Sequence, residues 1–344
     1  MSQNNNKFGN ACLCISNYAL LLYLLIVDEE TAKNDTYYVF GKAIDKKVLN
    51  KITPNIFVPS RNGNSIKDVV MRFWDKMRLR NFWDDKPVDL NTCTFYAQDH
   101  AFLSILLRNV DYKLLSDCPN YFTINMQEGS SEYRKLEKNK HSLAGKLQRL
   151  MYGDVAVSTF GNNSHCKEIY LTEENISPVL DGKLLHEKSM QELWNESTES
   201  KKRFIENIFD VDREELKCFD GKVIFFSQPL VEDGNMSEAE YVEYIKKIFG
   251  QYDTSKLLIK THPRDKFDYQ SLFPEIQIYT KPINAQLLVL MGLNVDRVAT
   301  ICSSAVYTFP ESVEIDWYAN SNPIMKAYCN GTIKPFRKYN DIVL

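Results

Sequence analysis

The sequence lacks the cysteine patterns that mark metal or redox sites. Its eight cysteines in 344 residues form no CxxC pair and no cluster with histidine. Cys12 and Cys14 lie together in an apolar segment, which favours buried thiols over a metal site. Scattered thiols of this kind are typical of a protein in a reducing compartment. We therefore expect reduced cysteines and no cysteine-bound metal.

Two nucleotide-binding fingerprints are also missing. The sequence contains neither GxGxxG nor GxxxxGK[ST], so neither a dinucleotide-binding turn nor a P-loop is indicated. The formal net charge is only −3, with charged residues making up 25% of the chain. This overall charge does not indicate a nucleic-acid partner, and we expect none.

Apolar residues 11–27 fall short of the roughly 20 residues that span a membrane. Ser16 and Asn17 interrupt this run, and only Lys7 precedes it as a basic residue. A signal peptide would need a basic region before the run and a small-residue cleavage site after it. A signal or anchor stays an alternative, but a buried strand (11–15), a loop and a buried helix (18–27) explain the segment better.

The rest of the chain alternates between strand-like and helical patterns. With 44% hydrophobic residues, the chain is long enough for two domains. Alternating strands and helices indicate an α/β fold whose parallel sheets are covered on both faces. We predict strands at 11–15, 36–40, 55–58, 92–96, 121–126, 167–172, 222–227, 256–261, 276–279 and 297–302. We predict helices at 18–30, 65–81, 99–108, 131–151, 237–250 and 284–293.

These elements divide into two open α/β domains. We expect one domain at 1–160, a connecting segment at 161–217 and a second domain at 218–344, whose last helices could pack back on the first domain. Two such domains would face each other across a central cleft. Because ligands of open α/β sheets bind beyond the carboxyl ends of the strands, the residues that follow each strand are the candidate site.

Polar residues follow four of the predicted strands. Three sets lie in the second domain: Ser227-Gln228-Pro229, His262-Pro263-Arg264 and Ser303-Ser304. The fourth set, 127–131, follows strand 121–126 in the first domain. Paired serines at the start of a helix suit a phosphate, although a simple helix N-cap explains the same pattern. His262 precedes a proline, and it is either a ligand-binding residue or a loop histidine bonded to the backbone.

Two other patterns have competing explanations. Asp210 and Asp212 resemble an acidic pair that holds a divalent ion, but Asp212 with Glu215 also fits a capping box at a helix start. Residues 71–83 mix basic and aromatic side chains. That segment could rest on an anionic membrane surface or contact an anionic acceptor. It could equally be an ordinary amphipathic helix that buries Phe73, Met77 and Phe82.

Several short motifs together resemble those of known enzymes. "QEGSSEY" (127–133) resembles the acidic-acidic-glycine motif of bacterial sialyltransferases, "KTHPRDKFDY" (260–269) their His-Pro motif, and "CSSAVYTF" (302–309) their serine motif. "SQPL" (227–230) and "KPINAQLL" (281–288) are similar to nucleotide-side segments of glycosyltransferase family 52. The order of the motifs along the chain also matches. This family includes lipooligosaccharide and capsular sialyltransferases, and some members transfer other sugars.

The resemblance implies a GT-B architecture, with two Rossmann-like domains and an active site between them. It implies an inverting transfer of sialic acid from CMP-sialic acid to a hydroxyl of a cell-surface glycan, with no cofactor and no essential metal. Glu128 would be the catalytic base, and His262 would donate to the departing phosphate, as a cation or an acid. The donor would contact Ser227, Gln228, Pro229, His262, Pro263, Gln286, Ser303 and Ser304. The acceptor would contact Ser16, Asn17, Gln98, Asp99, Gln127, Gly129 and Ser130.

Two departures from the family pattern keep alternatives open. Gln127 stands at the first acidic position of the motif, so Glu132 is a second candidate for the base. Gln286, or Asn284, stands where relatives often have a glutamate beside the nucleotide sugar. The same fold with another nucleotide-sugar donor, for example in glucosyl transfer, is therefore one alternative. A glycan-binding or assembly protein without catalysis is another.

The cytoplasm, where activated nucleotide sugars are made, is the expected location. Peripheral association with the inner membrane face would use residues 71–83 or the basic stretch KPFRK at 334–338. The sequence does not define the oligomeric state, for which a homodimer is one option.

Overall fold

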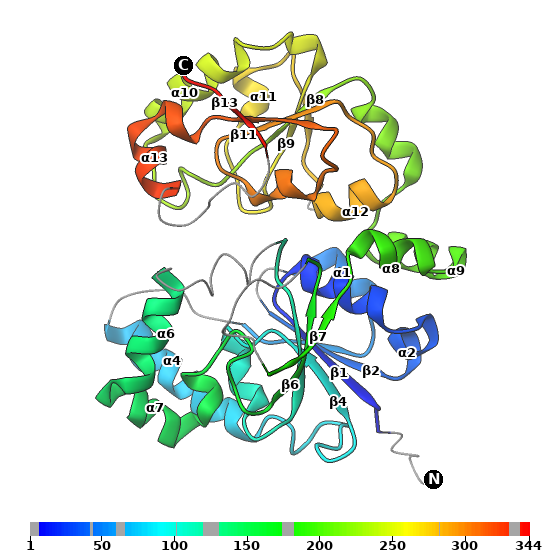
Figure 1. Cartoon of the computed structure of the whole chain (residues 1–344), viewed down its shortest axis with the longest axis vertical. Coiled ribbons are helices and arrows are strands. Elements are labelled where there is room, and N and C mark those ends of the chain that lie inside the picture. The colour runs from blue at the N-terminus through cyan, green and yellow to red at the C-terminus, as the bar shows by residue number, and fades with distance from the viewer. Residues whose placement is uncertain are drawn as a thin grey trace. The chain divides into compact units, whose positions relative to one another are not determined.

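The computed structural model divides the chain into two compact units, Met1–Asp210 and Val211–Leu344 (Figure 1). It describes residues 7–41, 44–59, 66–100, 102–119, 131–173, 182–281, 283–329 and 338–344. Each unit contains one sheet whose strand pairs are all parallel. The predicted α/β fold with two Rossmann-like domains is therefore confirmed, and each unit is described below by itself.

The first unit contains a seven-stranded sheet in the order β3-β2-β1-β4-β5-β6-β7. Its strands are β1 (Asn10–Cys14), β2 (Thr36–Phe40), β3 (Asn55–Phe57), β4 (Thr94–Ala97), β5 (Tyr112–Leu115), β6 (Cys166–Leu171) and β7 (Leu184–Glu187). The order reverses between β1 and β4. These two strands pair directly, with Asn10–Leu13 of β1 opposite Thr94–Ala97 of β4. This reversal is the topological switch point of the sheet, where such folds place their ligands.

Helix α1 covers one face of this sheet. Ser16 caps α1 (Asn17–Ile26), and the helix then continues through leucines and tyrosines that are buried on all sides. A helix that is apolar all round needs partners on both sides. Tyr23 contacts the rings of Tyr38 and Tyr96 on the sheet, and α8 (Met190–Glu196) packs against α1. The predicted strand, loop and buried helix at 11–27 are thus confirmed.

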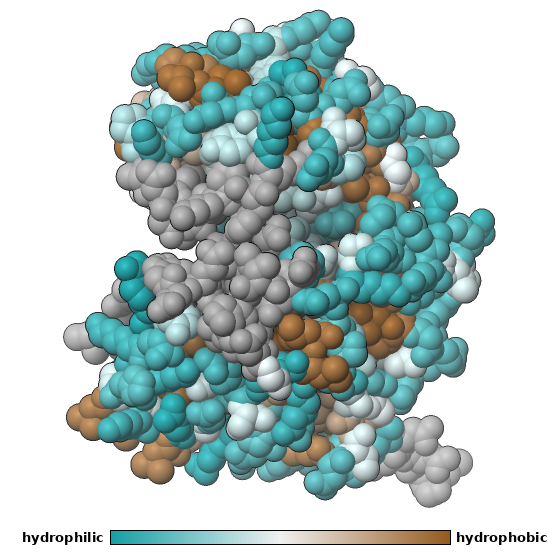
Figure 2. All heavy atoms as spheres, viewed as in Figure 1, coloured by the Kyte–Doolittle hydropathy of each residue, from teal (hydrophilic) through white to brown (hydrophobic). Residues whose placement is uncertain are grey.

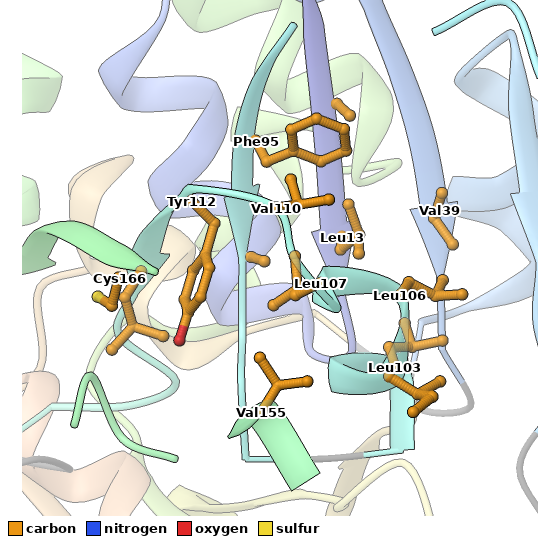
Figure 3. Packing of buried hydrophobic residues seen from close by; sticks show 14 of the residues in the cluster. Leu13, Val39, Phe95, Leu103, Leu106, Leu107, Val110, Tyr112, Val155 and Cys166 are labelled. Atoms are coloured by element: carbon orange, nitrogen blue, oxygen red, sulfur yellow. The ribbon is translucent and has the colours of Figure 1, made fainter. Parts of the chain in front are cut away.

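The other face of the sheet carries the main core of the unit (Figure 3). Strand residues on this face meet the 3₁₀ helix η2 (Phe102–Leu107), which contributes Leu103, Leu106 and Leu107. The helix predicted at 99–108 is therefore a shorter 3₁₀ turn. The remaining helices of the unit are α2 (Glu29–Asn34), α3 (Lys46–Lys51), α4 (Ile66–Arg78), α6 (Ser131–His141), α7 (Leu143–Tyr152) and α9 (Glu199–Ile208).

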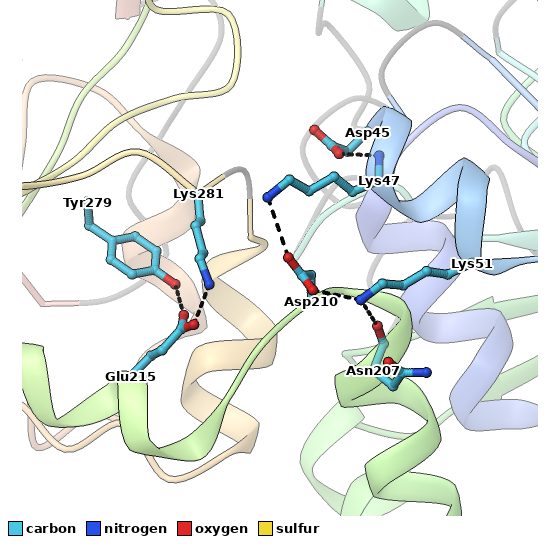
Figure 4. Close-up of polar contacts among 8 residues, drawn as sticks. All are labelled: Asp45, Lys47, Lys51, Asn207, Asp210, Glu215, Tyr279 and Lys281. Atoms are coloured by element: carbon cyan, nitrogen blue, oxygen red, sulfur yellow. Dashed lines mark hydrogen bonds and ion pairs between the residues drawn. The ribbon is translucent and has the colours of Figure 1, made fainter.

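Residues 161–210 belong to the first unit, unlike the connecting segment expected at 161–217. Strands β6 and β7 extend the first sheet, with β6 pairing to β5. The unit ends at Asp210, whose carboxylate binds Lys51 at 2.7 Å and Lys47 at 3.4 Å (Figure 4). Strand β7 has the sequence Leu184-Leu185-His186-Glu187, which does not alternate between apolar and polar residues. It therefore gives little periodic signal, and the sequence places this boundary poorly.

The second unit contains a six-stranded sheet in the order β10-β9-β8-β11-β12-β13. Its strands are β8 (Val223–Phe226), β9 (Leu257–Lys260), β10 (Gln277–Tyr279), β11 (Arg297–Thr300), β12 (Glu314–Trp317) and β13 (Asn340–Asp341). Its helices are α10 (Glu238–Phe249), α11 (Tyr269–Leu272), α12 (Ala285–Leu290) and α13 (Pro323–Cys329). The order reverses between β8 and β11, which pair from Val223 to Phe226.

Among the residues that the structure describes, no helix combines the length and apolar character needed to cross a membrane.

Candidate active site

Three predicted motifs lie side by side at the switch point of the second sheet. Ser227 directly follows β8. One residue separates His262 from the end of β9, and two residues separate Ser303 from the end of β11. Strand β8 lies between β9 and β11 in the sheet. Because all three strands are parallel, their carboxyl ends meet at one edge. Segments separated by up to 76 positions in the sequence therefore converge at the place where this fold class binds nucleotides.

The imidazole of His262 is held in a defined tautomer. The backbone N–H of Arg264 donates to Nδ1 of His262 at 3.1 Å, so a neutral ring carries its proton on Nε2. Burial, together with the positive charges of Arg264 and Lys260, lowers the pKa of His262 to about 4. Without a ligand the ring is neutral at physiological pH. It therefore presents an N–H donor rather than the cation considered from the sequence.

Ser227 positions the His262 loop. Its Oγ accepts from the backbone N–H of His262 at 3.0 Å and donates to the Asp265 carboxylate. Asp265 also accepts from the Tyr269 hydroxyl at 2.8 Å, and burial raises the pKa of this carboxyl. The hydroxyl proton of Ser227 is thus engaged inside the protein. Its role in this network is to fix His262.

The β11 end is tied to β8 by side-chain hydrogen bonds. Thr300 Oγ1 donates to the Phe226 carbonyl at 2.9 Å and accepts from the Ser303 backbone N–H at 3.0 Å. Gln228 donates to the Cys302 carbonyl at 3.0 Å. Ser303 caps the 3₁₀ helix η7 (Ser304–Thr308), because its Oγ accepts from the Ala305 N–H. The N-cap explanation of the paired serines is confirmed, and the cap leaves the Ser303 hydroxyl proton available for a ligand.

Lys260 brings a buried positive charge to the same edge. It is the last residue of β9, only 4% exposed, and its Nζ donates to the Thr261 carbonyl at 3.0 Å. Desolvation lowers the pKa of its ammonium group to about 8. A partly desolvated ammonium beside His262 raises the local positive potential, which favours an anionic ligand.

The charge coupling between Lys260 and His262 leads to a measurable shift. Replacing Lys260 by methionine is expected to raise the pKa of His262 from about 4, because a like charge that disfavours the imidazolium is removed. Binding of CMP is expected to raise the same pKa in the native chain. Proton NMR of the histidine Hε1 signals across pH 3.5–8 measures both shifts. The matched control is Lys266→Met, an exposed lysine, which should leave the titration unchanged.

The remaining donor candidates lie around this edge. Asn284 caps α12, where its side chain accepts from the Gln286 N–H at 2.9 Å. Of the two amides weighed from the sequence, Asn284 is therefore used by the cap, and Gln286 is 9% exposed in α12. Pro229 is buried, whereas Pro263, which follows His262, is exposed.

The first sheet gathers its own polar cluster at its switch point. Gln98, which follows β4, accepts from the Ile15 N–H at 2.8 Å and donates to the Asp117 carboxylate at 2.6 Å. Its amide also lies 3.5 Å from Oγ of Ser16, the cap of α1. Asn17 is the first residue of that helix. The predicted acceptor residues Ser16, Asn17 and Gln98 thus lie together at the ends of β1 and β4.

Asp117 and His100 also belong to this cluster, although Asp117 was not among the residues predicted from the sequence. His100 Nε2 lies 3.3 Å from Asp117 Oδ2. Burial raises the pKa of Asp117, but the hydrogen bond and charge of His100 outweigh burial and hold the pKa below its usual range. The only sequence signal for Asp117 is the polar pair Ser116-Asp117 after the short apolar run at β5, a strand that was not predicted.

Asp99 has a structural role in the first unit. Its side chain is fully buried, and it accepts from the N–H groups of Phe160 and Gly161 and from the Tyr112 hydroxyl. Phe160 and Gly161 both have positive φ angles, so this carboxylate holds a strained turn. These contacts leave Asp99 directed into the protein rather than toward an acceptor.

The acidic motif lies outside the described residues. Glu128, Gln127, Gly129 and Ser130, together with strand 121–126, fall within 120–130, and the side chain of Glu132 is likewise not described. Helix α6 follows directly at Ser131. The catalytic role of Glu128 therefore stays a prediction from the sequence.

The two aspartates weighed as a metal site have separate partners. Asp210 binds Lys47 and Lys51, whereas Asp212 caps the 3₁₀ helix η5 (Arg213–Phe219) by accepting from the Glu214 N–H at 2.9 Å. In the second unit, Glu215 pairs with Lys281 and Tyr279 (Figure 4). Within the described residues, no group of three or more His, Cys, Asp or Glu side chains could hold a metal ion.

Comparison with known proteins agrees with this arrangement. The profile of glycosyltransferase family 52 matches residues 69–319. The chain belongs to this family. The match contains every motif described above, including the acidic motif. Because this is a family of glycosyltransferases, the chain is a glycosyltransferase.

Individual relatives support the fold assignment. An uncharacterised protein of Haemophilus influenzae is 28% identical over 306 residues, which cover 88% of this chain and 92% of that protein. The GT-B domain of a Photobacterium damselae sialyltransferase superposes with a TM-score of 0.52 at 13% identity, covering 94% of each chain. A 2,6-sialyltransferase of Photobacterium sp. JT-ISH-224, solved with CMP and lactose, gives 0.59 at 12% identity, covering 93% of this chain and 76% of that one. This family 52 chain therefore has the GT-B fold.

Proposed function

We propose that this family 52 enzyme transfers sialic acid from CMP-sialic acid to a hydroxyl of a cell-surface glycan, as in lipooligosaccharide or capsule. The observation that carries the proposal is the convergence of Ser227, His262 and Ser303 at the switch point of the second sheet. A structural neighbour holding CMP and lactose supports a nucleotide donor and a glycan acceptor.

The proposed chemistry is a single displacement that inverts the anomeric carbon and uses no metal. Glu128 removes the proton of the acceptor hydroxyl as the hydroxyl oxygen attacks. The bond between sialic acid and the CMP phosphate breaks, and negative charge develops on that phosphate. His262 Nε2–H and the hydroxyls of Ser303 and Ser304 stabilise this charge, and Lys260 adds positive potential. The acceptor binds at Ser16, Asn17 and Gln98 in the first unit.

The donor base is tested by thermal denaturation with a panel of CMP, UDP, GDP and ADP. A ligand that binds only the folded state raises the melting temperature in proportion to ln(1 + [L]/Kd). CMP is expected to give the largest rise, and His262→Ala should reduce it. A rise with UDP but not with CMP would favour another sugar donor, an alternative that Gln127 and Gln286 motivate.

The proposed reaction takes place in the cytoplasm, where its activated donor is made.

A glycan-binding protein without catalysis is the second alternative. Transfer from CMP-sialic acid by the purified protein would exclude it.

A further inference from the structure

Helix α7 of the first unit turns its apolar face to solvent. Leu143, Leu147 and Leu150 are 84%, 55% and 79% exposed. Their spacing of four and three residues places them within about 60° of one another around the helix axis. Amphipathic helices of soluble proteins normally bury such a stripe against the core. Figure 2 shows exposed apolar residues at the lower left of the view, where Figure 1 draws α6 and α7.

Close packing fixes this orientation. Gly145 and Tyr152 are the buried residues of α7, and they lie on the side of the helix opposite the leucines. A Cβ at Gly145 would lie 1.7 Å from the Asn139 carbonyl oxygen at the end of α6, so only glycine allows this approach. Ser142 caps α7 by accepting from the Gly145 N–H at 2.9 Å. The stripe therefore points outward because of specific contacts.

Helix α4 adds aromatic surface beside α7. Phe73 contacts the ring of Tyr152 at 6.3 Å, and Lys76 lies over the same ring at 5.2 Å. Trp74 is 56% exposed and Phe73 39%. Met77 and Phe82 pack on the core as the amphipathic-helix explanation expected, but Phe73 is only half-covered.

The charge around this surface is strongly basic. Helices α6 and α7 (131–152) contain six lysines and arginines and two acidic residues, and residues 66–81 contain five lysines and arginines and two acidic residues. The whole chain, by contrast, has a net charge of −3. Lys138 and Lys146 are exposed, whereas Arg149 pairs through its Nε with the Asp154 carboxylate at 2.9 Å. An apolar stripe with basic flanks is the pattern of helices that lie in the headgroup region of anionic membranes.

We propose that α7 docks this enzyme on an anionic lipid surface. We call this docking surface the α7 face: Leu143, Leu147 and Leu150 with the flanking Lys138 and Lys146. The leucines enter the boundary between headgroups and acyl chains, while Lys138 and Lys146 contact lipid phosphates. The basic flanks favour a lipid occupant over a second copy, because two identical basic faces would repel each other. Docking needs neither donor nor acceptor and is independent of the proposed sialyl transfer.

Vesicle co-sedimentation of the full chain tests this proposal. The probes are vesicles of 70% phosphatidylethanolamine and 30% phosphatidylglycerol, with phosphatidylcholine vesicles as the neutral comparison. The native chain is expected to bind the anionic vesicles, and less so as salt rises. A triple variant, Leu143→Ser, Leu147→Ser and Leu150→Ser, should weaken binding at least about tenfold. Lys138→Gln with Lys146→Gln should reduce the preference for anionic vesicles.

The control is a matched triple variant on exposed apolar residues elsewhere, Leu184→Ser, Leu272→Ser and Ile324→Ser, which should bind as the native chain does. Circular dichroism melting checks that each variant is folded. Equal binding by the α7 triple variant and the native chain would overturn the proposal. Failure of the native chain to bind either kind of vesicle would also overturn the proposal. A dimer in analytical ultracentrifugation that dissociates only in the α7 triple variant would overturn it too, because it would assign the α7 face to a second copy of the chain.

Discussion

The variant His262→Ala is expected to lose about 10²- to 10³-fold in kcat/KM for sialyl transfer. The Arg264 N–H occupies Nδ1, so the neutral ring offers Nε2–H as its one donor. Alanine removes this donor, and the charge that develops on the CMP phosphate loses a preorganised partner. Steady-state transfer from CMP-sialic acid to a lactose acceptor measures the effect, with thermal melting to confirm the fold.

His186→Ala is the matched control for this experiment. His186 lies in β7 of the first unit, where its ring stacks on that of Tyr170 with the centroids 4.3 Å apart. It should keep turnover close to that of the native chain. If His262→Ala also keeps it while folded, the phosphate is stabilised by other residues and the assignment of His262 is wrong.

The variant Glu128→Gln is expected to lower kcat by about 10²- to 10⁴-fold while leaving CMP binding intact. A glutamate with a pKa of about 4.3 is ionised at neutral pH and can accept the acceptor proton, whereas an amide cannot. Because only the catalytic base is removed, the effect should appear in kcat. The rise in melting temperature that CMP produces should stay unchanged. This pattern separates it from the loss in His262→Ala, which should also weaken CMP binding.

Glu132→Gln provides the comparison that locates the base. Gln127 occupies the first acidic position of the motif, so the two glutamates are alternatives for one role. Transfer that survives in Glu132→Gln and fails in Glu128→Gln supports the proposed assignment. The reverse result would assign the base to Glu132 instead.

The sequence predicted most strands of the fold because long apolar runs carry a clear signal. Strands β1, β2, β8 and β9 lie within two residues of their predicted bounds. Strands β5 and β12 were missed, since each has only four residues and β12 includes Glu314 and Asp316. Both strands lie inside their sheets, β5 between β4 and β6 and β12 between β11 and β13, and their pairing with these neighbours has no local pattern in the sequence.

The candidate site shows the same division between local and tertiary information. Residues directly after apolar strands, such as Ser227, His262 and Ser303, could be found from the sequence alone. Their supporting groups could not, because Asp265 and Thr300 act through contacts with residues 38 and 74 positions away. The burial that shifts the pKa of Lys260 likewise depends on the packed sheet around it.

A crystal structure of the chain with CMP tests the central claim most directly. We expect the phosphate beyond the carboxyl ends of β8, β9 and β11, with its oxygens about 3 Å from His262 Nε2 and from the hydroxyl of Ser303 or Ser304. A phosphate bound elsewhere on the chain, with His262 making no contact to the nucleotide, would contradict the account.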